Sequence, residues 1–185
     1  MQKLNKTGKV ITKILEVFHW IGAVGMAVAA VCIGIASHSV SGFESLVSGN
    51  FSSGELEVYG FRIDSPIVNG ELKVGAFVVF CIGAALIFVL MAMIFRNLYL
   101  IFKKSENSTP FQKDNVRMMR EIGIFAIAIP VIGFIMSIIL RIVGGVDFVE
   151  ISIDMGGISM GIIILCFSQF FAHGVELEED VDGLL

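Results

Sequence analysis

The sequence contains few charged residues for its length. Asp, Glu, Lys and Arg make up only 16% of the 185 residues, whereas hydrophobic residues make up 56% and the mean hydropathy is +0.87. Soluble globular domains seldom reach this hydropathy. The composition therefore excludes an ordinary soluble domain and predicts an integral membrane protein.

Cysteine and histidine are also scarce, with three of each. A metal site usually draws on Cys or His pairs at short spacing, and no such pair occurs. We therefore expect no metal and no cofactor, with the cysteines as buried free thiols and the histidines as polar residues at the membrane interface. The six residues are Cys32, Cys81, Cys166, His19, His38 and His173.

Catalytic motifs are missing as well. The sequence has no nucleophile elbow, phosphate loop, HExxH motif or paired carboxylates. Three serines in the apolar runs, Ser137, Ser159 and Ser168, have no base near them in sequence. We therefore expect that the protein is not an enzyme.

Four apolar runs are long enough to cross a bilayer, because about 20 helical residues span about 30 Å of hydrocarbon. We expect spans at 14–36, 74–102, 122–140 and 155–172 within a single membrane domain, 1–185. The first run could instead be a cleaved signal peptide, but it is longer than a usual signal core, so an uncleaved helix is favoured. The predicted fold is an all-α, four-helix integral membrane protein.

The distribution of Lys and Arg predicts the orientation of these spans. Four bases precede the first span, and six belong to the middle segment: Arg96 at the end of the second span and five more before the third. Ten of the 13 bases therefore fall in these two segments. The positive-inside rule places both segments in the cytoplasm. Both termini are then cytoplasmic, including the acidic tail at 173–185, and the loop at 37–73 is external. We expect the protein in the bacterial cytoplasmic membrane.

Ionisable residues in the spans lie near the span ends. Transporters and pumps usually place such groups at mid-depth. Glu16 and Glu121 are the two that we single out, since each could pair with Arg96 or Arg120 between helices.

The external loop contains a strand pattern. The segment E-L-E-V-Y-G-F-R-I-D at 55–64 alternates apolar and polar residues, with an irregularity such as a bulge at Gly60. Asn69-Gly70 is a turn signal. The strand-like segment 148–153 could pair with this loop. We predict a small external β element.

The stretch 109–121 predicts a basic amphipathic helix at the membrane. Thr109 would be its N-cap, with Pro110 in the first position and Gln112 completing a capping box. One face carries three bases, which could bind anionic headgroups, a partner protein, or the acidic tail of the same chain. The bases are Lys113, Arg117 and Arg120, and the tail acids include Glu176, Glu178 and Glu179.

Gly157 and Gly161 form a small-xxx-small motif in the fourth span. Two helices can approach closely at such a motif because there are no side chains between the backbones. The motif could serve packing within one bundle or formation of a homo-oligomer.

Two stretches resemble a known family. T-P-F at 109–111, followed by Asn115 and by R-E-I-G at 120–123, resembles the sequence that enters the third helix of the domain-of-unknown-function family 2975. F-F-A-H-G-V-E-L-E-E-D at 170–180 resembles its closing motif. Met119 stands where many members carry Leu, and the C-terminus departs from the usual ending. The resemblance covers nearly the whole chain.

The resemblance implies a small bacterial protein of four transmembrane helices and carries no activity. Such proteins are often encoded beside a helix-turn-helix regulator, which implies a cytosolic transcription regulator as partner. Our leading hypothesis is a non-enzymatic sensor or regulatory protein that binds lipid and this partner but not nucleic acid directly. The alternatives are a small transporter or channel component, or a structural subunit of a membrane complex.

Overall fold

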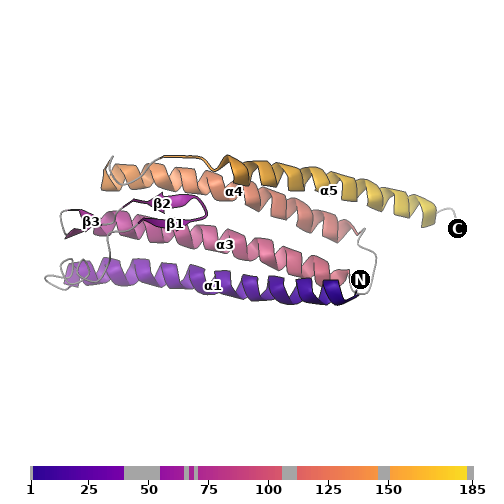
Figure 1. The fold of residues 1–185 in the computed structure, drawn as a ribbon, viewed down its shortest axis with the longest axis horizontal. Helices are drawn as coiled ribbons and strands as arrows, with labels where there is room; N and C mark the ends of the chain where they lie inside the picture. Colours follow the sequence, from indigo (N-terminus) through magenta and orange to yellow (C-terminus); the bar gives the residue numbers. More distant parts are fainter. Residues whose placement is uncertain are drawn as a thin grey trace. The chain divides into compact units, whose positions relative to one another are not determined.

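The computed structural model describes residues 2–39, 55–64, 67–68, 71–105, 112–145 and 151–182. Four long helices and four short strands occur in these residues (Figure 1). The helices are α1 (Gln2–Ser39), α3 (Val74–Lys104), α4 (Lys113–Gly144) and α5 (Met155–Asp182). The strands are β1 (Leu56–Val58), β2 (Phe61–Ile63), β3 (Ile67–Val68) and β4 (Glu71–Leu72). The predicted all-α class with a small β element is confirmed.

Each described helix is long and apolar enough to span a membrane. Each contains one predicted span, and α1, at 38 residues, would be about 57 Å long at 1.5 Å per residue. The basic N-terminus, the basic stretch before the third span and the acidic tail are therefore not separate elements among the described residues. They are extensions of the spanning helices, and α4 continues through Pro130.

The helices differ in how much of their apolar length the protein itself covers. In α3 and in α4, 39% of the most apolar window is buried, compared with 11% in α1 and in α5. Apolar side chains that the protein leaves uncovered suit the hydrocarbon of a bilayer. This also corrects one expectation about cysteine: Cys81 is buried, but Cys32 and Cys166 are exposed. An apolar run in a membrane protein does not imply burial in protein.

The chain divides into two compact units, which are described separately. Unit 1 comprises Met1–Trp20, Leu90–Ala128 and Met155–Leu185, and unit 2 comprises Ile21–Val89 and Ile129–Asp154. Helices α1, α3 and α4 contribute residues to both units.

In unit 2, β1 and β2 form an antiparallel hairpin with Val58 opposite Phe61. The two residues between them, Tyr59 and Gly60, have φ angles of 49° and 81°. Positive φ at both central positions is the geometry of a type I′ turn, which matches the twist of a two-residue hairpin. Gly60 is therefore a turn residue between two strands, whereas the sequence predicted one strand with an irregularity at Gly60. A second pair, β3 and β4, places Val68 opposite Glu71, on either side of the predicted Asn69-Gly70 turn.

The β1–β2 hairpin lies against α3 and α4 (Figure 1), and Phe61 is its contact residue with both helices. Phe61 and Ile63 are completely buried, and the Phe61 ring stacks on Phe80 with 5.2 Å between centroids. A methyl group added to Gly83 would lie 2.6 Å from the Phe61 ring, and one added to Gly133 would lie 3.6 Å from Phe61 Cβ. The hairpin thus sits where glycines on both helices leave room for an aromatic ring.

A second cluster in unit 2 joins β4 to α1 and α3. Leu72, Phe77, Cys81 and Ala30 are all buried in it. The segment 151–154 lies beside the hairpin turn, since a methyl group on Gly60 would be 3.4 Å from Asp154 Cβ. It forms no strand. The rest of the segment predicted to pair with the loop, 148–150, lies outside the described residues.

Candidate functional site

The first turns of α4 have the two faces that the sequence predicts. Lys113, Arg117 and Arg120 are exposed, whereas Met118 and Ile122 are 3% and 5% exposed. The basic side chains therefore face outward from a helix whose apolar side is packed within unit 1.

The structure describes this helix from Lys113 onward. The Val116 amide donates to the Gln112 carbonyl at 3.1 Å, so Gln112 accepts the first hydrogen bond of the described helix. Thr109 and Pro110 lie outside the described residues, and the predicted cap at Thr109 stays a prediction.

Two polar contacts join α4 to the end of α3 within unit 1. Asn97, which is 4% exposed, donates from Nδ2 to Glu121 Oε2 at 3.0 Å. Nearer the helix ends, Lys104 pairs with Asp114. The buried contact contributes more to stability than the exposed ion pair, because water competes with the exposed pair.

Helix α1 brings a second polar group to unit 1. Glu16 is 7% exposed and accepts from Lys13 Nζ at 3.0 Å, while that nitrogen lies 5.1 Å from the centre of the Tyr99 ring. His19 is 3% exposed; its Nδ1 lies 2.7 Å from the Leu15 carbonyl, so Nδ1 carries the proton and donates. Polar side chains are thus buried between helices in this unit.

These contacts correct the predicted pairing of the two glutamates. Glu16 pairs with Lys13 on its own helix, and Glu121 accepts from Asn97 and lies 3.7 Å from Arg117 Nε. The prediction had Arg96 or Arg120 as partners. The actual partners of Glu16 and Arg117 are one helical turn away, where side chains on one face meet with little loss of freedom. The Asn97 contact needed the packing of two helices and has no sequence signal.

Gly161 lies at a close approach between α4 and α5. A methyl group on Gly161 would be 2.5 Å from Ile127 Cγ1 and 2.9 Å from the Gly123 carbonyl oxygen. A methyl group on Gly123 would in turn be 2.7 Å from Leu165 Cγ. Gly161 thus packs within the chain, with Gly123 as its partner, and Gly157 is half-buried. Gly123 was part of the family motif, although spacing alone did not mark it as a packing residue.

The same contacts set the register of the two helices. Gly123 lies against Leu165, and Ile127 lies against Gly161. The two helices are therefore antiparallel, and residue numbers rise along α4 as they fall along α5. Lys113, ten residues before Gly123, therefore lies level with Val175. Arg117 and Arg120 lie level with residues 171 and 168, about one and two turns further along.

This register separates the three bases with respect to the acidic tail. Glu176 begins the acidic part of α5 and lies beside the level of Lys113, while Arg120 is about 12 Å away along the helix axis. Glu176 itself pairs with His173 at 3.1 Å, on an exposed surface. The side chain of Glu179 lies outside the described residues. Of the three bases, Lys113 is the one placed to meet the tail.

The acidic end of α5 also exposes apolar side chains. Leu177 and Val181, four residues apart on one helical face, are 67% and 58% exposed, whereas Val175 is 6% exposed. Four acids alternate with them: Glu176, Glu178, Asp180 and Asp182. Such a charge density cannot enter hydrocarbon, so these two apolar residues face water in the isolated chain.

Two buried serines, Ser137 and Ser168, make hydrogen bonds within their own helices. Ser137 donates to the Gly133 carbonyl at 2.9 Å and Ser168 to the Leu165 carbonyl at 2.7 Å, so each bonds to its own helix. In the part of the chain that the structure describes, no three His, Cys, Asp or Glu residues are grouped to hold a metal ion.

The chain belongs to a protein family whose function is unknown. A family profile described as "Protein of unknown function (DUF2975)" matches residues 64–183. The match begins after β2, so α1 and the first hairpin precede it and the family resemblance covers less of the chain than expected. No curated protein and no solved structure matches the chain significantly.

Proposed function

We propose that this protein is a non-enzymatic regulatory protein of the bacterial cytoplasmic membrane that docks a cytosolic protein on the end of α5. The observation that carries the proposal is the exposure of Leu177 and Val181 on an acidic helical extension. Apolar residues one turn apart on a helix are the usual anchors of a helix that binds in a groove. Lys113 on α4, which lies level with Val175, adds a base about 3 Å along the axis from Leu177 and about 9 Å from Val181.

The charge distribution supports the orientation. The basic start of α1 and the six bases around the α3–α4 connection belong to unit 1 together with the end of α5. The positive-inside rule would then place these basic segments, and with them the end of α5, on the cytoplasmic side. A cytosolic helix-turn-helix regulator, the partner that the family resemblance implies, would meet the end of α5 there.

A binding measurement tests this docking. The full chain in nanodiscs of neutral lipid is titrated with the purified product of the neighbouring regulator gene. The double variant Leu177→Ser/Val181→Ser should weaken binding by about tenfold or more, because each lost apolar anchor contributes about 1–2 kcal/mol. The matched control is Val10→Ser/Ile14→Ser, an exposed apolar pair with the same spacing on α1, which should leave binding unchanged.

A second pair of variants examines the basic face of α4. Arg117→Glu/Arg120→Glu is compared with Lys6→Glu/Lys103→Glu, which changes charge equally on other exposed bases of unit 1. If the basic face binds the partner, only the first variant weakens binding in neutral lipid. If it binds headgroups, the first variant acts only in anionic nanodiscs. Absence of binding by the unaltered chain would refute the docking proposal.

A transporter or channel component is the second candidate, and one observation favours it. Glu16 and His19 are buried at 7% and 3% exposure on a spanning helix, and Asn97 is buried with them in unit 1. Buried ionisable groups in a membrane protein often mark an ion path. Proton and cation flux into liposomes, measured with Glu16→Gln as the variant, tests this candidate. Flux through the unaltered chain that the variant abolishes would establish it in place of the docking role.

A further inference from the structure

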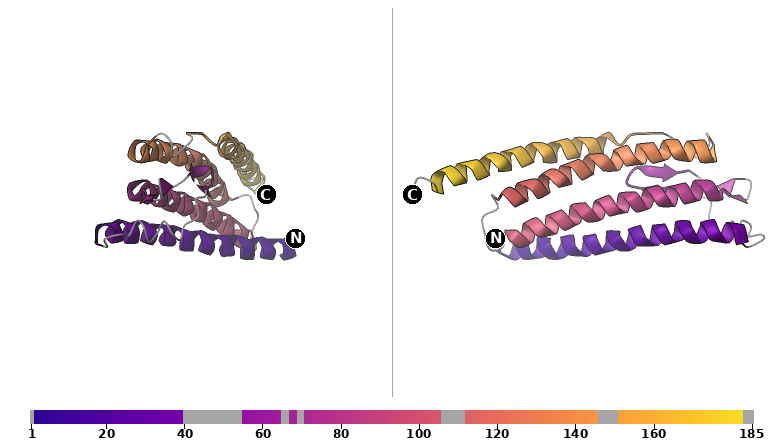
Figure 2. Two further views of the ribbon diagram at one scale, coloured as in Figure 1. Left: turned by 60° about the vertical axis from the view of Figure 1, so that its left-hand side comes forward. Right: turned by 180° about the vertical axis from the view of Figure 1, so that it is seen from behind.

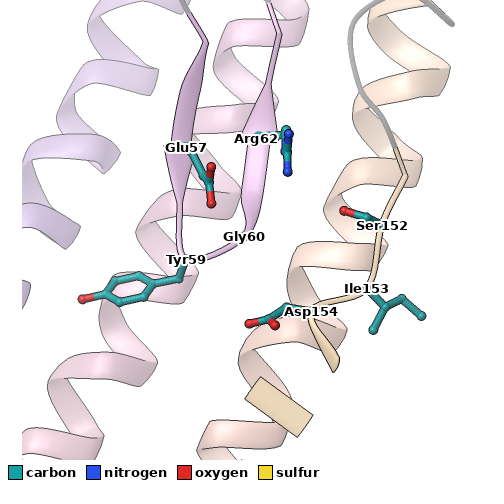
Figure 3. A pocket seen from close by; sticks show the side chains of 7 residues that line it. All are labelled: Glu57, Tyr59, Gly60, Arg62, Ser152, Ile153 and Asp154. Atoms are coloured by element: carbon teal, nitrogen blue, oxygen red, sulfur yellow. The ribbon is translucent and has the colours of Figure 1, made fainter. Parts of the chain in front are cut away.

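A polar cleft lies beside the β1–β2 hairpin in unit 2 (Figure 3). Its volume is about 400 Å³, and it lies between the hairpin and the segment that precedes α5. Two segments far apart in sequence therefore build it, one ending before the family match begins and one inside that match. Its lining includes Glu57, Gly60, Arg62, Ser152 and Asp154.

The cleft brings charges of both signs to one space. Glu57 and Arg62 are directly opposite on the two strands, and Asp154 is on the other wall. Figure 3 shows the Arg62 side chain directed toward the 152–154 segment, with Ser152 and Asp154 directed back toward the hairpin. Ile153 points away, so the surface turned inward is polar.

Arg62 is only partly satisfied by its neighbours in the protein. Its Nη1 lies 3.1 Å from Glu55 Oε1, outside the cleft lining, and not against Glu57 directly across the hairpin. Its Nε is buried without a hydrogen-bond partner among the described residues. Because Nε is buried and 36% of the side chain is exposed, the terminal guanidinium nitrogens are the donors that a ligand in the cleft can reach.

The cleft rests on a rigid support. The strand that carries Arg62 has completely buried neighbours on either side, Phe61 and Ile63. Gly60 approaches Asp154 at the turn, where a positive φ favours glycine. Charged groups held on a packed hairpin are preorganised, which is the requirement for a selective polar site.

We propose that this cleft binds a small zwitterion of amino-acid size. The ammonium group would lie between the Glu57 and Asp154 carboxylates, and the carboxylate would accept from the exposed side of the Arg62 guanidinium and from the Ser152 hydroxyl. Arginine forms paired hydrogen bonds with a carboxylate, and a volume of about 400 Å³ falls within the range of small-molecule sites.

A zwitterion would be the signal that the proposed regulatory protein senses. Only this signalling role rests on the proposed function; the binding of the ligand does not. Ligand binding is measured without a partner protein. The cleft can therefore fail its test while the α5 docking holds, and the reverse is equally distinguishable.

The test uses the full chain in neutral-lipid nanodiscs and isothermal titration with a panel of free L-amino acids. For any amino acid that binds, its N-acetyl form lacks the ammonium charge and its amide lacks the carboxylate. Each blocked form should bind about tenfold or more weakly, the usual effect of losing one charge-assisted contact.

Two variants assign the charged groups by their effect on discrimination rather than on affinity alone. Arg62→Gln should remove the preference for the amino acid over its amide, and Asp154→Asn should reduce the preference over the N-acetyl form. The matched controls, Arg141→Gln and Asp64→Asn, change described residues outside the cleft lining and should preserve both preferences.

The ratio of the affinities for the amino acid and for its blocked form is measured within one variant. A loss of folded protein lowers both signals equally and leaves this ratio unchanged. The proposal fails if no amino acid binds the unaltered chain, if the blocked forms bind equally well, or if Arg62→Gln keeps the preference. Binding of amides as tightly as of amino acids would instead identify a site for organic cations.

Discussion

The two units of this protein use opposite chemistry to pack largely the same helices. In unit 1, polar groups such as Glu16, His19 and Asn97 are buried between helices. In unit 2, Phe61, Phe80 and the residues around them form an apolar interior, and the charged groups line an open cleft. Figure 2 gives two further views of the helices that carry these contacts.

The two units differ because unit 1 must provide hydrogen-bond partners for buried polar groups, whereas unit 2 must bury the apolar face of a hairpin. Polar side chains between spanning helices can lower their energy only by bonding to each other or to backbone carbonyls. A hairpin beside the spans has polar edges that solvent can reach, so its apolar face alone needs packing. Loss of a residue should therefore remove packing energy in unit 2 and a specific hydrogen bond in unit 1.

The largest effect is expected from Phe61→Ala. It should lower the free energy of unfolding by about 3–5 kcal/mol, because a completely buried ring stacked on Phe80 would be replaced by a cavity. Denaturant unfolding in detergent, followed by circular dichroism, measures the change. Ile153→Ala, at an exposed position, is the control and should stay within about 0.5 kcal/mol. Equal effects of the two variants would contradict an aromatic core under the hairpin.

A smaller effect, about 1–3 kcal/mol, is expected from Gly161→Ala in unit 1. The added methyl group would lie 2.9 Å from the Gly123 carbonyl oxygen and 3.0 Å from the Ile127 amide nitrogen, so the α4 backbone must move. The same unfolding measurement applies. Gly25→Ala is the matched control, because no atom lies within 4 Å of its added methyl group and alanine favours a helix. A destabilised Gly25→Ala together with an unaffected Gly161→Ala would contradict the assigned packing.

Buried and exposed polar contacts of unit 1 can be compared directly at Glu121. Asn97→Ala should cost about 1–3 kcal/mol, since it removes a buried donor to this carboxylate. Arg117→Ala should cost only about 0.3–0.5 kcal/mol, because that pair is exposed and spaced i,i+4. Thermal unfolding at low and high salt distinguishes them: the Arg117 effect should fade with salt and the Asn97 effect should persist.

The smallest effect concerns Tyr59 at the hairpin turn. Although 44% of Tyr59 is exposed, the partial burial of its hydroxyl raises the pKa above the ordinary value, so the folded chain favours the neutral phenol. Its contribution to stability is present below the unfolded pKa, near 10, and is lost as pH rises through the folded pKa. Unfolding free energy measured between neutral and alkaline pH should fall less steeply in Tyr59→Phe. An identical pH dependence in both chains would contradict this burial.

Local patterns in the sequence were sufficient for the elements. The four spans, the outward face of Lys113, Arg117 and Arg120, and an irregularity at Gly60 all follow from period, charge and turn chemistry. The limits of these patterns were equally local. The predicted single strand across Gly60 is two strands joined by a two-residue turn, because an irregularity in an alternating pattern leaves the hydrogen-bond register open.

The sequence by itself determined four helices that are long and apolar enough to span a membrane, the family, and the outward basic face at the start of α4. Only the tertiary structure decided which groups meet: Asn97 with Glu121, Gly123 with Gly161, and Arg62 with the segment that carries Asp154. The physical reason is the separation along the sequence of the residues that interact. A helical face or a turn depends on residues within one or two turns of each other, whereas a buried hydrogen bond, a close approach of two backbones or a cleft depends on the packing of segments distant in sequence.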